Sequence, residues 1–343
     1  MDSTNMRDHI LKQGLSAKKT LEKNKRKVEE FAADAEFDKI IINGAGDKYL
    51  IGLIASYLWR EHGREPLSVL HSRDLAENPP YIDENTLVIY LSQSGKTTDT
   101  MMAAKAAKKQ GAQSLVITNL KEPIKESLWM LKDSGPVFNT HTEIYPEVSL
   151  PSTMTFHSTL SLLWHVLGEL AGIDIYKKLI DSAEKTHELS IDQMTEKHAL
   201  ETAKELSKYS SRYVFGDGPR YGLARKLGLI MFMEGVKVNA FPLMTEEFLH
   251  SAIETLEKEN KDKLPLLIFL PPKTHSFYKH SEKVAKFWEE HAPVFRIEAP
   301  TNDEFSVQSQ MVLPTWISYH EAILRGVDPG VSHLVSKVRG SGF

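Results

Sequence analysis

The chain has 343 residues, a length that predicts about two domains. Hydrophobic residues make up 41% and charged residues 26%, a globular composition that excludes disordered, collagen-like and low-complexity chains. The formal net charge of −4 argues against nucleic acid or a membrane surface as the main partner, and the lack of cysteine excludes disulfides and thiolate chemistry. We expect a cytoplasmic protein, because no apolar run approaches the roughly 20 residues of a membrane span and the N-terminus is not signal-like.

The first part of the chain predicts a helix followed by an α/β domain. Residues 7–34 carry apolar side chains at near-helical spacing, within an N-terminal segment 1–35. Short apolar strands then alternate with helices over residues 36–172, and they fall at 39–42, 67–70, 87–91 and 114–117. Such strands are typical of a parallel sheet that is buried on both faces, so we expect a doubly wound domain.

The second part repeats this plan. Residues 152–208 are predicted to be helical throughout, and 173–208 form a connector. A second domain is predicted over 209–325, with a helix at 221–234 and strands at 213–215, 238–241, 264–270 and 294–297. Both domains open with a strand, a Gly-x-Gly turn and a helix, which indicates a duplicated architecture. A last helix at 313–325 precedes a C-terminal tail, 326–343.

The strongest local motif is the hydroxyl-rich run Ser92–Thr100, where a strand ends and a helix begins. Its hydroxyls, Gly95 and the free N–H groups of the helix start predict a cradle for a phosphate-sized anion, to which Lys96 adds positive charge. Ligands of open parallel sheets bind at such strand ends, where the strand order reverses. The alternative is a simple helix cap made by Thr97 or Thr98.

Other motifs carry less chemistry. Gly44-x-Gly46 and Gly216-x-Gly218 lack the spacing of a dinucleotide site, so we interpret them as turn glycines. His157 and His165 share a face of an apolar helix, but no third ligand stands at metal spacing in the sequence. We interpret them as core or interface histidines, and we expect no metal and no organic cofactor.

A family resemblance follows from the order of the motifs. The Gly-x-Gly turn, the run Ser-Gln-Ser-Gly-x-Thr-x-Asp-Thr at 92–100, the run Glu-x-x-Leu-x-Ser-Thr at 147–153 and a second such domain resemble the double-SIS (sugar isomerase) family. Similar proteins are the isomerase domain of glucosamine-6-phosphate synthase and the fructosamine-6-phosphate deglycases. The resemblance covers the chain from about residue 36, and it implies two flavodoxin-like SIS domains with an N-terminal helix and a C-terminal tail.

The resemblance also implies a set of binding residues for an anionic sugar. The serine loop would hold the 6-phosphate and the Gly-x-Gly turn would lie beside it, and the 147–153 run would contact the sugar. The residues implied are Ser92, Gln93, Ser94, Thr97, Gly46, Lys48, Leu150 and Ser152.

Three residues are implied to be catalytic. Glu234 matches the proton-transfer glutamate, and His250 matches the ring-opening histidine at the family interval. Lys337 matches a lysine in a tail that closes over the sugar. Glu246 and Glu247 lie one turn before His250, so we expect a carboxylate to set its tautomer. Without the resemblance, these three residues also fit a helix end, a charged surface helix and a tail charge.

Departures from the family leave the substrate open. Asp47-Lys48 stands where a small hydroxyl residue is common, Lys96 where an acid is common, Met154 where a lysine is usual, and Ser251-Ala252 where Gly-Pro is usual.

We therefore expect an aldose–ketose isomerase of a hexose with an anionic C6 group, either a 6-phosphate or a 6-sulfonate. The alternatives are a ketosamine-6-phosphate deglycase and a non-catalytic sugar-phosphate sensor. The resemblance further implies a homodimer or larger homo-oligomer with shared active sites, in which His250 completes the neighbouring subunit's site.

Overall fold

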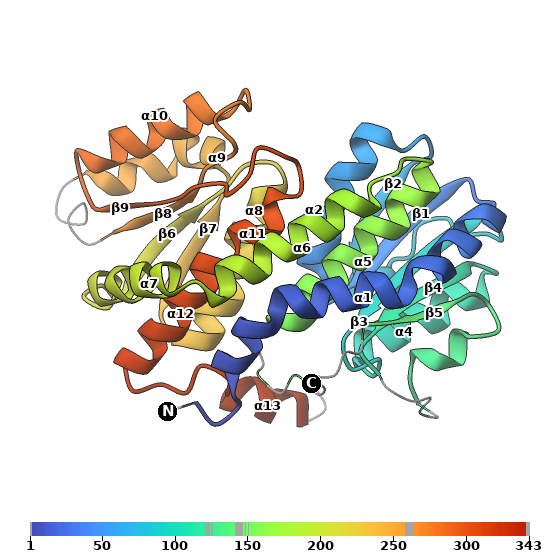
Figure 1. The fold of residues 1–343 in the computed structure, drawn as a ribbon. Helices are drawn as coiled ribbons and strands as arrows, with labels where there is room; N and C mark the ends of the chain where they lie inside the picture. Colours follow the sequence, from blue (N-terminus) through green and yellow to red (C-terminus); the bar gives the residue numbers. More distant parts are fainter. Residues whose placement is uncertain are drawn as a thin grey trace. The chain divides into compact units, whose positions relative to one another are not determined.

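The computed structural model describes residues 2–120, 124, 126–140, 147, 149, 151–257 and 264–340. The chain forms two compact units. The N-terminal unit comprises Gln13–Pro146 and Met154–Glu184, and the C-terminal unit comprises Met1–Lys12, Glu147–Thr153 and Lys185–Phe343. Each unit contains one parallel sheet flanked by helices, which confirms the predicted α/β class (Figure 1). None of the helices among the described residues is long and apolar enough to cross a bilayer.

The sheet of the N-terminal unit has five parallel strands in the order β2-β1-β3-β4-β5. All seven residues of β3 are buried, because helices cover both faces of the sheet. The four predicted strands are present. The fifth, β5, has only three residues and was not predicted, because so short a segment shows no periodic pattern. The strands are β1 (Lys39–Gly44), β2 (Leu67–His71), β3 (Thr86–Ser92), β4 (Gln113–Thr118) and β5 (Val137–Asn139).

Helices pack on both faces of this sheet. On one face, α2 approaches closely at Gly52, where an added Cβ would lie 2.9 Å from side-chain carbons of Ile42 and Val69. On the other face, α3, α4 and η1 enclose a cluster that includes Ile41 and Val88. The helices are α1 (Met6–Asp34), α2 (Asp47–His62), α3 (Ser72–Glu77), α4 (Thr98–Lys109), the 3-10 helix η1 (Leu128–Leu131), α5 (Met154–Ala171) and α6 (Tyr176–Ile191).

The sheet of the C-terminal unit has four parallel strands in the order β7-β6-β8-β9. Pro242 lies in β7, and a proline is tolerated there because β7 is an edge strand. The ring of Trp288 packs against Phe215 of β6 and Phe248 of α9 (Thr245–His250). The strands are β6 (Ser211–Phe215), β7 (Asn239–Leu243), β8 (Leu266–Phe269) and β9 (Val294–Ile297).

A buried ion pair joins the start of β6 to helix α12. The guanidinium of Arg212 binds both carboxylate oxygens of Glu321 at 2.5 and 2.8 Å, and both side chains are fully buried. The helices of this unit are α7 (Gln193–Leu206), α8 (Pro219–Arg225), the π-helix η2 (Lys226–Val236), α9 (Thr245–His250), the 3-10 helix η3 (Ala252–Leu256), α10 (Tyr278–Glu289), α11 (Ser306–Gln310), α12 (Val312–Leu324) and α13 (His333–Gly340).

The structure corrects two sequence expectations about helices and adds a helix to the predicted C-terminal tail. The stretch 152–208 is not helical throughout, because Gly172 adopts a positive φ of 69° after α5 and Asp192 caps α7 through the N–H groups of its first turn. The helix expected at 221–234 is α8 followed by the π-helix η2, whose wider hydrogen-bond pattern cannot be read from apolar spacing. The C-terminal tail contains a helix, α13.

The duplicated architecture extends to backbone conformation. Gly46 has φ 56° and ψ −124° before α2, and Gly218 has φ 57° and ψ −133° before α8. An added Cβ would collide with the following helix at Gly44 and at Gly216, at 2.9 and 2.4 Å. Both Gly-x-Gly turns therefore bring a strand end close to the next helix, and the two sheets share the strand order 2-1-3-4 over their first four strands.

Candidate active site

In the N-terminal unit, the strand order reverses between β1 and β3. The chain leaves β1 toward β2 on one side, and β3 then pairs with the other side of β1. Ligands of such sheets bind outside the carboxyl ends of the strands at this position. Gly46 follows β1 and the Ser92 loop follows β3, so both predicted binding segments flank the reversal.

The Ser92 loop is held by its own hydroxyls and leaves the next helix uncapped. Ser92 is buried, and its Oγ accepts the N–H of Gly95 at 3.1 Å and lies 3.4 Å from Thr97 Oγ1. Ser94 Oγ accepts the N–H of Lys96 at 3.2 Å. Thr97 is the N-cap residue of α4, as the cap alternative predicted, but its side chain makes no capping hydrogen bond. The start of α4 therefore has no side-chain cap, and Ser94 and Thr97 beside it are exposed.

Gly95 is required by the turn of this loop. It has φ 63°, and a Cβ there would lie 2.3 Å from Leu120 Cδ1. Its carbonyl accepts the N–H of Leu128 at 2.9 Å. A side chain at this position would disturb both the left-handed backbone and the packing under the loop.

Thr155 joins two of the predicted binding residues. Lys48 is buried, and its ammonium donates to the Thr155 carbonyl at 3.3 Å, while Thr155 Oγ1 donates to Gln93 Oε1 at 3.1 Å. The structure therefore brings the helix after β1 and the loop after β3 together on the first turn of α5. Sequence reasoning missed Thr155, because its only local signal is a threonine next to the Ser152-Thr153 motif.

A second polar chain runs along the same strand ends. Ser72 Oγ donates to Asn43 Oδ1 at 3.1 Å and lies 2.9 Å from Thr100 Oγ1. All three side chains are buried. They connect the end of β1, the start of α3 and the first turn of α4, and thus stabilise the position of α4 beside the sheet. In the sequence, the only indication of this chain was that polar residues, Asn43 and Ser72, stand at the ends of two apolar strands.

Other predicted residues belong to the C-terminal unit. The buried carboxylate of Glu147 accepts the N–H and the hydroxyl of Thr153 at 2.5 and 2.9 Å. The carbonyl of Ser152 accepts the buried ammonium of Lys226, at 2.8 Å. The 151–153 segment is thereby held against η2, the helix that carries Glu234. Leu150 lies outside the described residues.

Glu234 is half-buried near the end of the π-helix. Its carbonyl accepts the ammonium of Lys237, and it also accepts the hydroxyl of Ser332 at 3.4 Å. Lys237 has a positive φ of 66° and donates to the Val331 carbonyl at 2.8 Å. Partial desolvation lowers the pKa of Lys237, while the Glu234 and Asp328 carboxylates act in the opposite direction. Lys237 and Ser332 therefore connect the backbone of Glu234 to the segment that leads to α13. The sequence analysis did not predict this role for Lys237.

His250 and Lys337 are both exposed, on α9 and α13 respectively. The expectation that a neighbouring carboxylate orients His250 was wrong. Glu247 instead accepts the N–H of Met244 at 2.8 Å and caps α9, and Glu246 lies 3.7 Å from His280 Nε2. Glu247 thus caps its own helix and Glu246 lies near His280, so neither carboxylate is bound to His250.

The equivalent reversal in the C-terminal unit, between β6 and β8, is filled by the protein's own side chains. Asp217 accepts the N–H and the hydroxyl of Thr245 at 3.0 and 2.5 Å, and the Ser281 hydroxyl at 3.2 Å. Buried Arg220 donates to Gln310 at 2.8 Å, and its burial lowers its pKa to about 10. The polar side chains at this reversal are therefore bound to other side chains of the same unit.

A cavity of about 300 Å³ lies elsewhere in the N-terminal unit. It is lined by α2 and β2 side chains that include Leu53, Trp59, Arg60 and Val69, and it contains none of the predicted site residues. Its position away from the strand ends gives it no role in the chemistry proposed below.

Two family models match the chain. The SIS domain matches residues 35–167, and the bacterial phospho-glucose isomerase C-terminal SIS domain matches residues 195–341. The chain belongs to the double-SIS family. The family resemblance predicted from the sequence is therefore confirmed. The first SIS domain contains the sheet β2-β1-β3-β4-β5, and the second contains the sheet β7-β6-β8-β9.

Curated relatives in this family have the name glutamine–fructose-6-phosphate aminotransferase [isomerizing]. The Thermococcus kodakarensis protein is 26% identical over 348 residues, which cover 94% of this chain and 56% of the relative. The Pyrococcus horikoshii protein is 27% identical over 249 residues, which cover 69% of this chain and 38% of the relative. The chain thus spans about 38–56% of the length of these relatives.

Solved structures share the double-SIS fold. Glucosamine-6-phosphate deaminase from Thermotoga maritima has a TM-score of 0.77 at 18% identity, with 96% of this chain and 97% of that chain covered. Tagatose-6-phosphate ketose/aldose isomerase from Escherichia coli has a TM-score of 0.76 at 16% identity, with 96% of each chain covered. At this level of identity the likeness shows the fold.

Proposed function

We propose that this double-SIS protein is an aldose–ketose isomerase that acts on a hexose with an anionic group on C6, namely a 6-phosphate. The observation that carries the proposal is the Ser92–Thr97 loop, which follows β3 at the strand reversal and leaves the start of α4 without a side-chain cap. An uncapped helix start with adjacent hydroxyls is suited to a small anion. The matched SIS domains and the sugar-phosphate names of several relatives support the same substrate class.

The binding half of the site would hold the sugar by its phosphate. Ser94, Thr97 and the N–H groups of the first turn of α4 donate hydrogen bonds to the phosphate oxygens. Ser92 shapes the loop through the Gly95 N–H. Gly46 leaves open space beside the start of α2, since no heavy atom lies within 4 Å of an added Cβ there. Lys48 supplies buried positive charge nearby.

The catalytic half would move one proton between two carbons of the same substrate. His250 opens the ring by protonating the ring oxygen and taking the proton of the C1 hydroxyl. The Glu234 carboxylate then removes the C2 proton, and the C2–H electron pair forms the C1–C2 double bond of an enediol. The protonated Glu234, which can exchange its proton with solvent, then protonates C1. The hydroxyl proton of O2 passes to O1, so the atoms balance. Lys337 stabilises negative charge on the enediolate oxygens.

A deglycase or deaminase is the second candidate function. It is favoured by the fold shared with glucosamine-6-phosphate deaminase and by the Phe232-Met233-Glu234 sequence, which is similar to that of the deglycases. The same carboxylate would move a proton at C1 or C2 of an amino sugar, and hydrolysis of the C–N bond would release the amine. Release of ammonia or an amino acid from a 6-phosphorylated amino sugar distinguishes this function from isomerisation.

The test is a panel of hexose 6-phosphates, their 6-sulfonates and uncharged hexoses in D₂O, with deuterium incorporation at C2 followed by NMR. We expect exchange and interconversion with at least one 6-phosphate. Glu234→Gln should lower exchange by about 10²–10⁴-fold without changing substrate affinity, as for loss of a general base. Glu205→Gln, at a partly exposed glutamate of α7, is the matched control. Binding of sugar phosphates without turnover would instead indicate a sensor, and unchanged exchange in Glu234→Gln would remove Glu234 from the mechanism.

The phosphate assignment has its own matched pair of variants. Thr97→Val removes the hydroxyl of the N-cap residue, and Thr98→Val removes a neighbouring exposed hydroxyl on the first residue of α4. We expect Thr97→Val to weaken binding of the 6-phosphate about tenfold, as for loss of one charge-assisted hydrogen bond, and Thr98→Val to have little effect. Equal effects of the two variants would contradict the proposed cradle.

We further propose that the protein is a homo-oligomer in which His250 acts on substrate held by the neighbouring subunit. The exposed position of His250 on α9 is compatible with this role. Inactive His250→Ala and Glu234→Gln chains should regain activity when mixed, because one site of each heterodimer would carry both wild-type residues. Continued inactivity after mass spectrometry has confirmed mixed dimers would contradict sharing.

A further inference from the structure

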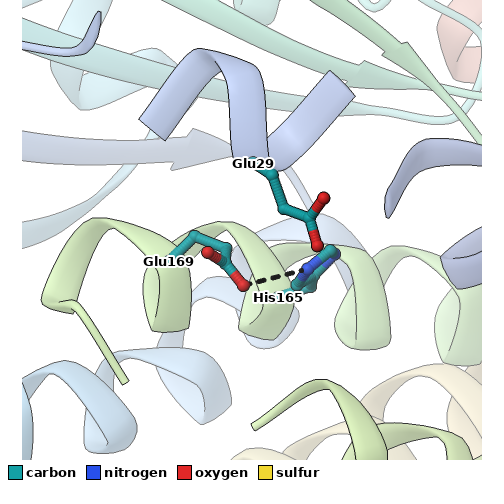
Figure 2. Close-up of side chains that lie close together, drawn as sticks. All are labelled: Glu29, His165 and Glu169. Carbon is teal, nitrogen blue, oxygen red and sulfur yellow. Dashed lines mark ion pairs between the residues drawn. The ribbon is translucent and has the colours of Figure 1, made fainter. Parts of the chain in front are cut away.

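We propose that Glu29, His165 and Glu169 form a binding site for one divalent transition-metal ion of the zinc class, within the N-terminal unit (Figure 2). One potential ligand atom from each of the three side chains lies within 4.8 Å of the other two. Glu29 comes from α1, and the other two residues lie one turn apart on α5. The site is independent of the proposed isomerase activity.

His165 is the central observation. Its side chain is fully buried, and neither ring nitrogen makes a hydrogen bond to the residues that the structure describes, although Nε2 lies 3.4 Å from a carboxylate oxygen of Glu169. A buried polar atom left without a partner is destabilising, so this imidazole favours a ligand. Burial lowers the pKa of His165 to about 4, and nearby Lys25 acts in the same direction. An unprotonated nitrogen of this imidazole has a lone pair to offer a metal.

The geometry of the pair on α5 fits metal coordination. His165 Nε2 lies 3.4 Å from Glu169 Oε1. Zinc–nitrogen and zinc–oxygen bonds of about 2.0–2.1 Å in a tetrahedron place neighbouring ligand atoms about 3.4 Å apart. Figure 2 shows the Glu29 carboxylate reaching from α1 toward the same imidazole. Because one nitrogen and two oxygens are offered, a borderline ion such as Zn²⁺ is preferred to Mg²⁺ or Ca²⁺, which favour all-oxygen sites.

The local charges also favour a cation. Burial raises the pKa of Glu169, and the nearby carboxylates of Glu29 and Asp174 raise it further. Lys25 is the nearby counter-charge: its ammonium lies 3.8 Å from Glu29 and 4.5 Å from the centre of the Tyr176 ring. A dication bound by two carboxylates and a neutral imidazole relieves the repulsion between the acids, and Lys25 can remain over the Tyr176 ring.

The occupied site would connect two helices that are otherwise packed by side chains. Glu29 is about half exposed, so an ion can enter from solvent on that side, and water can complete the coordination shell. The bound ion would therefore stabilise the packing of α1 on α5.

The experiment uses the full-length, tag-free protein after treatment with a chelator. Isothermal titration with Zn²⁺ should show one site per chain, Co²⁺ should give the visible absorption of a tetrahedral site, and Mg²⁺ should give neither. Glu29→Gln should weaken Zn²⁺ binding at least tenfold. The matched control is Glu30→Gln, which removes an adjacent exposed carboxylate of α1 that pairs with Arg26. Glu29 is exposed at the surface, so its variant should fold, whereas a variant of buried His165 carries that risk.

Three outcomes decide the proposal. Tenfold weaker binding in Glu29→Gln, with Glu30→Gln like the wild type, supports it. No zinc binding by the wild-type chain overturns it. Equal binding by the wild type and Glu29→Gln also overturns it, because the zinc would then be held elsewhere on a chain that has 14 histidines, His165 included.

Discussion

The Ser92 loop depends on a glycine whose replacement has a calculable effect. Gly95→Ala places a Cβ on a residue with φ 63°, which costs about 1–2 kcal/mol. The same Cβ would lie 2.3 Å from Leu120 Cδ1, and because Leu120 is buried, relief of this contact costs about 1–3 kcal/mol more. Alanine also lowers the conformational entropy of the unfolded chain, which stabilises the folded state by about 0.4–1 kcal/mol. We therefore expect a net loss of about 1–5 kcal/mol in the free energy of unfolding.

The control for this prediction is Gly172→Ala. Gly172 belongs to the same unit and has φ 69°, but no heavy atom lies within 4 Å of an added Cβ. It therefore carries the backbone cost alone, and in urea unfolding Gly95→Ala should be less stable than Gly172→Ala by about 1–3 kcal/mol. A double-mutant cycle of Gly95→Ala with Leu120→Ala should show coupling of similar size. Equal stability of the two alanine variants, or no coupling, would refute the steric reasoning.

Gly46→Ala extends this comparison to function. Gly46 has open space around its added Cβ, like Gly172, but its φ of 56° and ψ of −124° lie outside the left-handed helical region, so Gly46→Ala should lose more stability than Gly172→Ala. If the open space beside Gly46 receives the substrate, only Gly46→Ala should raise KM, by about tenfold, because a methyl group would occupy that space. Steady-state kinetics under conditions where both variants are folded measures the difference. The same KM for both variants would contradict a binding role for Gly46.

Three further predictions concern the C-terminal unit. Glu321→Gln should lower the free energy of unfolding by about 3–5 kcal/mol in urea titrations, because it leaves a buried guanidinium unpaired, whereas Glu205→Gln on an exposed pair should change it by less than about 1 kcal/mol. Lys237→Met should lower kcat more than it raises KM, because it frees the backbone carbonyl of Glu234, and equal kinetics would show that this tie is dispensable. Burial lowers the pKa of His320, so as the pH falls below about 6.5 the unfolded chain takes up a proton at this residue before the folded chain does. The free energy of unfolding should therefore decrease below about pH 6.5, and it should decrease less in His320→Gln. Thermal melts at several pH values measure the difference.

The sequence by itself determined the class of the fold and the location of the serine loop. Nearly continuous apolar segments such as 87–91 can be buried only in a sheet covered on both faces, and the alternation with helices makes that sheet parallel. The Gly-x-Gly turns at Gly44 and Gly216 are local features, since a strand must approach the next helix closely there. Each of these inferences depends only on residues close together in the sequence, so the tertiary structure is not needed to make it.

Only the tertiary structure decided which distant side chains meet. Lys48 and Gln93 both bind Thr155, which lies 107 and 62 residues away from them in the sequence. Glu29 approaches His165 from another helix, and Lys237 ties Glu234 to the segment before α13. Periodicity shows which face of a helix is buried but not which helix will cover it. The π-helix that carries Glu234 also depends on packing, because its extra residue per turn is stabilised by contacts made far along the chain.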